Sequence, residues 1–109
     1  MMPAIPREEL LEILREVKEK LIEILGDDLV EVILFGSYAR GEAKEDSDVD
    51  VLVVVKRWPD PEEEWEIGEL MTDLVLKYGV VFSIITYPQK PEMFHDPLII
   101  AARKEGVKV

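Results

Sequence analysis

Apolar residues recur at helical spacing in the first part of the chain. Between residues 7 and 25 they repeat every three or four positions, at Leu10, Leu14, Val17, Leu21 and Leu25. This repeat is typical of an amphipathic helix with one buried stripe. Pro6 suits the first turn of such a helix, and Gly26 is a common stop. The pattern therefore predicts a helix over residues 7–25.

Two strand-like runs follow this helix. Residues 30–35 are mostly β-branched and apolar, and residues 50–55 contain five consecutive apolar residues. The first run predicts a strand, and the second predicts a strand that is covered on both faces. The segment between them, residues 36–47, is polar and contains two glycines, so we expect a turn with room for one helical turn.

A strong helix start comes next. Asp60 can cap the helix, Pro61 suits its first position, and Glu63 completes a capping box. We expect the helix to end at Gly79 and to bury a stripe of five residues: Ile67, Leu70, Met71, Leu74 and Tyr78. A third strand is predicted over residues 80–87.

The last part of the chain is divided by prolines. Pro88 and Pro91 indicate a loop, Asp96 and Pro97 begin a short helix that runs through Arg103, and residues 107–109 can add a short edge strand. The element order is therefore α-β-β-α-β-α. It predicts an α/β (α+β) fold, in which residues 1–109 form a single domain with a small mixed sheet packed by helices.

Composition narrows the possible functions. The chain has 109 residues, no cysteine and a net charge of −11, so disulfides and thiolate metal sites are excluded. An acidic chain without a basic stripe should not bind nucleic acid directly, although a divalent cation can still attract a nucleotide. No apolar stretch reaches the roughly 18 residues of a membrane span, and residues 1–7 lack the pattern of a signal peptide. We expect a soluble, cytoplasmic protein; self-association stays open.

The candidate chemistry lies in residues 36–50. Gly36 and Ser37 directly follow a predicted strand, where a missing side chain and free N–H groups can receive phosphates. After ten intervening residues, Asp48 and Asp50 stand two apart at the start of the next strand, so both carboxylates project from the same face. Such a pair can hold Mg²⁺ together with substrate phosphates.

This combination resembles the signature of the DNA polymerase β-like nucleotidyltransferase superfamily. The small size and the run GSYARG at residues 36–41 are most similar to the minimal nucleotidyltransferases (MNT). These proteins are often encoded beside HEPN-domain proteins, as the antitoxin of a toxin–antitoxin pair. The resemblance covers residues 10–87 in element order.

The resemblance implies transfer of a nucleotidyl group, commonly AMP from ATP, to a hydroxyl. In the antitoxin members that hydroxyl belongs to a tyrosine of the HEPN partner toxin. It also implies that Gly36 and Ser37 bind the nucleotide phosphates and that Asp48 and Asp50 are catalytic and bind Mg²⁺ or Mn²⁺. Arg40 would contact phosphate or brace the turn.

One position departs from the family pattern. The superfamily usually supplies a third carboxylate from the strand after the second helix, and the best-matching residue here is Ser83. A serine is neither a general base near neutral pH nor a substitute for the negative charge. The acceptor or a partner could supply the base; alternatively, the chain is a nucleotide-binding or partner-binding regulator with weak or no turnover. An antibiotic-modifying transferase is a third interpretation, disfavoured because 109 residues leave little room to bind an acceptor.

Further predictions concern single side chains near or beyond this motif. Arg40 could instead pair with Asp46 or Asp48 at the surface. Ser47 should stabilise the turn through local hydrogen bonds. A lone His95 in a proline-flanked loop supplies no metal site by itself, and we interpret the neighbouring Asp96 as a helix cap.

Two tryptophans and one apolar run are the remaining candidates. Trp65 is expected in the core or in a hydrophobic staple. Trp58 fits equally well as an exposed contact residue or as a cover over the sheet edge. Residues 98–102 are predicted to pack in the core, or to offer a partner surface if they are exposed.

Overall fold

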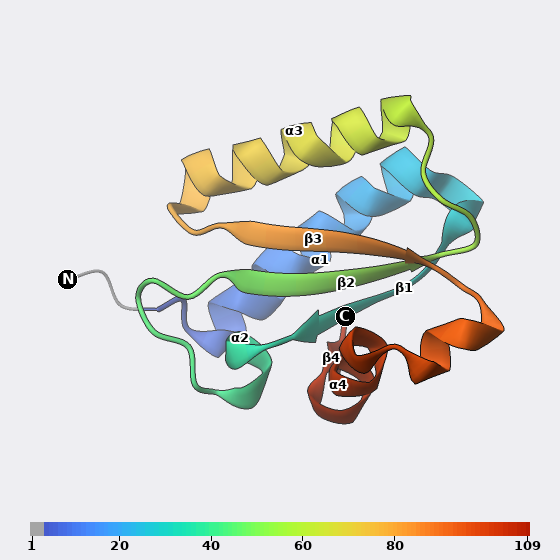
Figure 1. Ribbon diagram of the computed structural model, residues 1–109. Coiled ribbons are helices and arrows are strands. Elements are labelled where there is room, and N and C mark those ends of the chain that lie inside the picture. The colour runs from blue at the N-terminus through green and yellow to red at the C-terminus, as the bar shows by residue number, and fades with distance from the viewer. Residues whose placement is uncertain (1–3) are drawn as a thin grey trace.

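The computed structural model describes residues 4–109. Residues 1–3, part of the stretch that we expect not to be a signal peptide, lie outside the described residues. Helices, short 3-10 turns (η) and strands follow one another along the chain (Figure 1). Their bounds are α1 Arg7–Leu25, η1 Gly26–Asp28, β1 Leu29–Phe35, α2 Ser37–Arg40, β2 Val49–Val55, α3 Pro61–Tyr78, β3 Phe82–Pro88, η2 Pro91–His95, α4 Pro97–Glu105 and β4 Val107–Lys108.

The strands form one mixed sheet in the order β3-β2-β1-β4. Strand β1 runs antiparallel to both β2 and β4, whereas β2 and β3 are parallel. The parallel pair requires a crossover, and α3 provides it. The predicted mixed sheet, its three main strands and its short C-terminal edge strand are confirmed.

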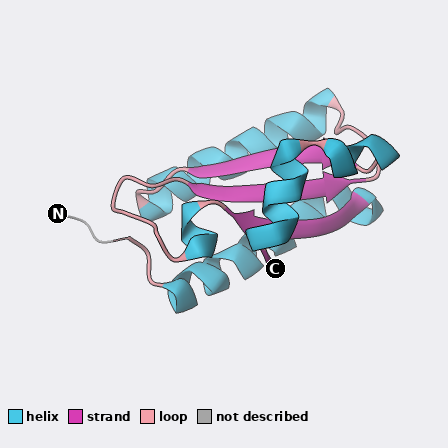
Figure 2. Cartoon of the chain, turned by 60° about the horizontal axis from the view of Figure 1, so that its bottom comes forward, coloured by secondary structure: helices cyan, strands magenta, loops and turns pink. Residues whose placement is uncertain are grey.

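Helices cover both faces of the sheet. On one face, α1 and α3 pack against alternate residues of β1 and β2. On the other face, α4 and η2 cover the intervening residues through Met93, Ile99 and Ala102; Figure 2 shows α4 lying in front of the strands. Because both faces are covered, residues 51–55 of β2 are all buried, as the continuous apolar run predicts.

The predicted helix signals act as expected. All five residues of the α1 stripe are buried. The Asp60 carboxylate accepts a hydrogen bond from the Glu63 N–H at 2.8 Å, and the Glu63 side chain accepts from the Asp60 N–H at 2.9 Å, so the capping box is complete. The Asp96 side chain caps α4 by accepting from the Leu98 N–H at 2.9 Å.

The prediction for Trp65 is wrong. Its side chain is 72% exposed, whereas Ile67 and Leu74 are the buried residues of α3. Two residues correspond to about 200° of rotation in an α-helix, so a residue two positions before the buried Ile67 faces away from the core. Trp58 is also exposed. In the run at residues 98–102, Ile99 and Ala102 are buried in the core, while Ile100 is exposed.

The structure also corrects some boundaries. Strand β3 begins at Phe82 rather than at residue 80, because the left-handed Gly79 (φ 71°) turns the chain and Val80 and Val81 lead it back to the sheet. Within residues 4–109, no helix combines the length and apolar character that crossing a membrane would require.

Candidate active site at the start of β2

Strand register assembles the site at one end of the sheet. Asp50, the second residue of β2, pairs with Phe35 of β1 on one side and with Ser83 of β3 on the other. Side chains alternate along a strand, so Asp50 shares the α4 face of the sheet with Leu52. Asp50 is half-buried, and Asp48, just before the strand, is exposed. The proposed third-acid position, Ser83, is thus the direct neighbour of Asp50.

The turn after β1 is built around Gly36. This residue has φ 76° and ψ −158°, a backbone conformation that residues other than glycine rarely adopt. A Cβ built on Gly36 would also collide with the Asp50 carboxylate, standing 3.1 Å from its Cγ. Ser37 then begins the short helix α2, in which the Gly36 carbonyl accepts hydrogen bonds from the N–H groups of Ala39 and Arg40 at 3.0 and 3.1 Å. The predicted turn with one helical turn is confirmed.

The two aspartates interact electrostatically. The pKa of Asp50 is raised from its ordinary value, first by burial and then by the nearby negative charge of Asp48, while the positive charge of Arg40 opposes the rise. The carboxylates of Asp48 and Asp50 are hard oxygen donors of the kind that divalent cations prefer, so the side chains present fit Mg²⁺ or Mn²⁺. In the part of the chain that the structure describes, no group of three or more Asp, Glu or His side chains gathers to hold a metal.

Arg40 joins α2 to the end of α4. Its guanidinium donates to Glu42 at 3.1 Å and to Glu105 at 3.0 Å. The surface ion pairs expected with Asp46 or Asp48 are therefore wrong in their partners, because the end of α4 brings Glu105 to α2 from 65 residues along the chain. Arg40 remains near enough to Asp50 to lower its pKa. Its contacts link α2 to α4, and both expected roles, phosphate contact and bracing of the turn, stay predictions.

The loop before β2 is held by Ser47. Its hydroxyl accepts a hydrogen bond from the Lys44 N–H at 2.8 Å, and its own N–H donates to the Lys44 carbonyl at 3.0 Å. The predicted local role of Ser47 is confirmed. Since Asp48 directly follows this turn, the turn determines where the first aspartate enters the site.

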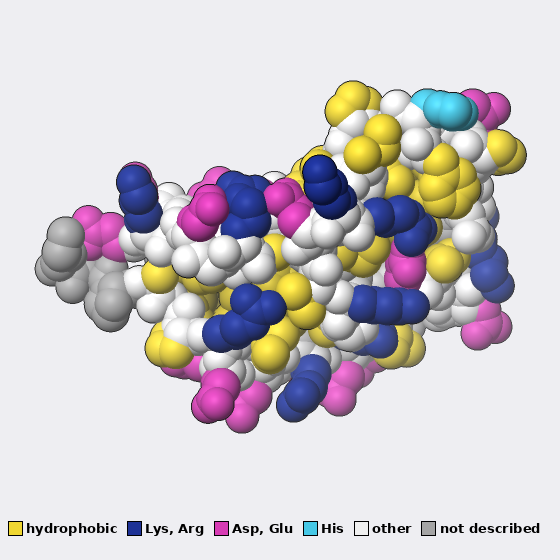
Figure 3. All heavy atoms as spheres, turned by 90° about the horizontal axis from the view of Figure 1, so that it is seen from below, with side chains coloured by type: hydrophobic (Ala, Val, Ile, Leu, Met, Phe, Trp, Pro, Cys, Tyr) yellow, Lys and Arg dark blue, Asp and Glu magenta, His cyan; other side chains and the backbone are white. Residues whose placement is uncertain are grey.

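His95 lies away from the aspartates. It belongs to η2, which follows β3, and the last residue of β3 pairs with Val55 at the opposite end of β2 from Asp50. Figure 3 shows the α4 side of the molecule, where apolar side chains gather around the histidine. His95 is therefore placed where it cannot act on groups bound at Asp50.

Two contacts near the site were missed by sequence reasoning. Tyr38 is buried, and its hydroxyl accepts a hydrogen bond from the Ile5 N–H at 3.3 Å, which ties the start of the chain to α2. Glu105 holds Arg40. No local pattern indicates either contact, because both depend on segments that only the fold brings together.

Comparison with known proteins identifies the family of this chain. The model of the nucleotidyltransferase domain matches residues 12–109. The chain is 47% identical over 79 residues to the protein MJ0141 of Methanocaldococcus jannaschii, covering 72% of this chain and 80% of that protein. It is 42% identical over 84 residues to the protein adenylyltransferase MntA of Thermococcus cleftensis, covering 71% and 83% of the two chains.

A solved structure has the same fold. One chain of the complex between the tri-AMPylated HEPN toxin and the MNT antitoxin of Shewanella oneidensis superposes with a TM-score of 0.55 at 18% identity, covering 89% of this chain and 69% of that one. The family match spans nearly all of the described chain and includes the Gly36 turn and both aspartates. The chain therefore belongs to the nucleotidyltransferase domain family and is a nucleotidyltransferase.

Proposed function

We propose that this chain transfers AMP from ATP to a hydroxyl of a HEPN-type partner protein and thereby acts as the antitoxin of a toxin–antitoxin pair. The observation that carries the proposal is the Asp50 carboxylate, which lies against the Gly36 turn with the negative charge of Asp48 close enough to act on it. The name of the Thermococcus relative and the AMPylated toxin of the Shewanella complex support protein as the acceptor and AMP as the transferred group.

Each residue of the site has a proposed task. Gly36 lets the Asp50 carboxylate lie against the turn, and Ser37 would add a hydroxyl donor toward the ATP phosphates. Asp48 and Asp50 would hold Mg²⁺ or Mn²⁺. A bound divalent ion neutralises charge that develops on the phosphates during transfer. Arg40, whose positive charge already acts on Asp50, would add a positive charge toward the same phosphates.

The reaction balances without a further cofactor. The acceptor oxygen forms a bond to the α-phosphorus, the bond from that phosphorus to the bridging oxygen of the β-phosphate breaks, and pyrophosphate leaves. The acceptor hydroxyl must lose its proton. Ser83, the neighbour of Asp50, is a poor base, so we propose that the partner or solvent receives this proton.

A second candidate function rests on the same serine. Because Ser83 stands where a third carboxylate would complete the site, the chain could bind ATP and its partner while turning over slowly or not at all. It would then act as a nucleotide-dependent regulator of the partner.

The test begins with calorimetric titration of ATP in the presence and absence of Mg²⁺. We expect magnesium-dependent binding that the Asp48→Asn/Asp50→Asn variant loses while its melting transition remains cooperative. Survival of binding in this variant would place the nucleotide elsewhere. Incubation of the wild-type chain with a HEPN-type partner and ATP, followed by mass spectrometry of the partner, separates the two functions. Added AMP supports transfer, and binding without added AMP supports the regulator.

A further inference from the structure

The two most exposed large apolar side chains of the described residues lie on a single helix. Trp65 is 72% exposed and Leu76 is 79% exposed, and both belong to α3. They are eleven residues apart, which corresponds to about three turns, so they project from the same face of the helix. Large apolar side chains that align on an exposed face are more typical of an interaction surface than scattered ones.

The same face is hollowed. A depression of about 460 Å³ runs along α3 and is lined by Glu64, Trp65, Gly68, Glu69, Thr72 and Asp73. Gly68 opens the middle of this depression, since a Cβ built there would meet no atom within 4 Å. The Thr72 hydroxyl already donates a hydrogen bond to the Gly68 carbonyl at 3.1 Å. A docked partner therefore does not need to supply an acceptor for this hydroxyl. The absence of a side chain at Gly68 lets another backbone approach closely.

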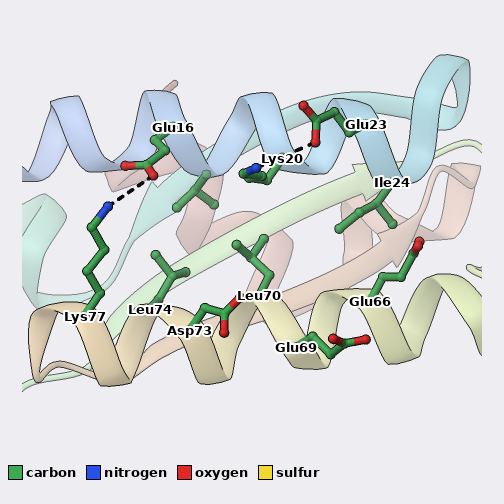
Figure 4. A pocket seen from close by; sticks show the side chains of 11 residues that line it. Glu16, Lys20, Glu23, Ile24, Glu66, Glu69, Leu70, Asp73, Leu74 and Lys77 are labelled. Atoms are coloured by element: carbon green, nitrogen blue, oxygen red, sulfur yellow. Dashed lines mark hydrogen bonds and ion pairs between the residues drawn. The ribbon is translucent and has the colours of Figure 1, made fainter.

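Unpaired carboxylates flank this surface. Helix α3 carries six acidic residues and one lysine: Glu62, Glu63, Glu64, Glu66, Glu69 and Asp73 against Lys77. In the groove between α1 and α3, of about 340 Å³, Glu16 pairs with Lys77 and Glu23 with Lys20 (Figure 4). Among residues 4–109, neither Glu69 nor Asp73 forms an ion pair, although both line the groove and the outer depression.

We propose that the outer face of α3, defined by Trp65, Gly68, Thr72 and Leu76, is a docking surface for a basic amphipathic helix of a partner protein. The apolar side chains of Trp65 and Leu76, about three turns apart on one face, suit leucine-type side chains at helical spacing. The free carboxylates suit lysine and arginine beside them. A second copy of this chain is a poor occupant, because its own α3 would bring the same excess of negative charge.

The surface also runs toward the end of the sheet that carries Asp50, whose side chain lies on the opposite, α4 face. Helix α3 ends at Tyr78, and the chain re-enters the sheet at Phe82, which pairs with Val49 beside Asp50. A helix docked along α3 would therefore run toward the end of the sheet where the acceptor hydroxyl must arrive. In this last step the inference rests on the proposed function, whereas docking itself does not require catalysis.

The test uses a synthetic helical peptide with a leucine stripe flanked by lysine and arginine. It is titrated into the ¹⁵N-labelled full chain and followed by NMR. We expect saturable binding with the largest shifts at residues 65–76, including the Trp65 indole. No saturable binding up to about 1 mM peptide, or equal binding of a peptide with glutamate in place of the basic residues, would overturn the proposal.

Matched variants locate the surface. Trp65→Ala should weaken peptide binding by at least about tenfold and Trp65→Phe by less, because a buried aromatic anchor dominates such interfaces. Trp58→Ala, which removes another exposed tryptophan, should leave binding unchanged. Glu69→Gln/Asp73→Asn should weaken binding more than Glu12→Gln/Glu19→Gln, which makes the same charge change on α1. Equal effects within either pair would contradict the assignment.

Two controls test the docking surface separately from the nucleotide site and from self-association. Asp48→Asn/Asp50→Asn should bind the peptide like the wild-type chain, so failure of the nucleotide site and failure of the docking surface are distinguishable. Sedimentation velocity of the chain alone tests the alternative occupant. Self-association that Trp65→Ala abolishes would assign the surface to a second copy and overturn the partner helix. Unchanged melting of every variant shows that the exposed substitutions leave the fold intact.

Discussion

The side chain of Asp50 occupies the space that any side chain at residue 36 would need. A Cβ on Gly36 would collide with the Asp50 carboxylate and stand 3.3 Å from the Asp50 Cβ. Glycine is thus required at residue 36 for two reasons: the backbone has a positive φ of 76°, and the Asp50 carboxylate approaches closely. The turn that should receive phosphates and the strand that should hold the metal consequently depend on each other.

Replacing Gly36 by alanine should both destabilise the protein and disable the site. We expect a loss of about 1–3 kcal/mol in the free energy of unfolding, from the strained backbone and the collision with Asp50. Gly41→Ala is the matched control, because Gly41 also has a positive φ (74°) but open space around it. Urea unfolding measures both variants. Equal losses would mean that the contact with Asp50 contributes nothing.

Asp50 should make the metal-free protein less stable as pH rises. Its pKa in the folded state is raised above the ordinary value of 3.8, chiefly by burial. The folded state therefore holds this proton more tightly than the unfolded state does, so the free energy of unfolding falls as pH rises from 3.8 through the folded pKa. Partial exposure keeps this effect small.

The measurement for this pH dependence is urea unfolding between about pH 3 and pH 8 with a chelator present. Asp50→Asn should lack this particular decline and be more stable than the wild-type chain at about pH 7, by up to about 1 kcal/mol. Saturating Mg²⁺ with ATP should reverse the order of the two proteins, because only the wild-type pair can bind. A wild-type-to-variant difference that stays constant with pH would contradict the assigned cause.

Ser83→Asp should raise the rate of nucleotidyl transfer. The new carboxylate would stand beside Asp50 in the parallel register and supply both a base and a metal ligand. We expect an increase of about tenfold or more if the missing acid limits the rate. Ser83→Asn is the control, since it adds similar bulk without charge. An unchanged rate in both variants would mean that a carboxylate at residue 83 is not the missing proton acceptor, which leaves the partner or solvent in that role.

Glu105→Gln distinguishes the two roles of Arg40. The variant loses an exposed ion pair and should therefore be destabilised by less than about 1 kcal/mol. If Arg40 contacts phosphate, its guanidinium is freed from a competing carboxylate, and ATP should bind more tightly by calorimetry. If Arg40 only braces α2, ATP affinity should stay the same or fall. Glu42→Gln, which removes its other partner, should change the affinity in the same direction.

Local patterns determined most of the elements. The apolar repeat of α1, the capping box of α3 and the continuous apolar run of β2 each depend on residues a few positions apart. Such signals act within one turn or one strand, so they can be read along the chain. The boundaries were less well predicted: β3 begins two residues late, because Gly79 alone does not reveal how far the chain travels before it pairs with β2.

The sequence predicted which residues make up the candidate site. The fold determined how these residues are arranged. The spacing of Gly36, Asp48 and Asp50 indicated the chemistry, because a strand-turn-strand unit keeps these residues close in sequence. Only the strand register places Ser83 beside Asp50. Only the packing of α4 gives Arg40 its partner Glu105, and only the orientation of α3 exposes Trp65. These contacts join segments that are far apart in the chain. Core packing across all the helices and strands brings the segments together, so no local pattern predicts the contacts.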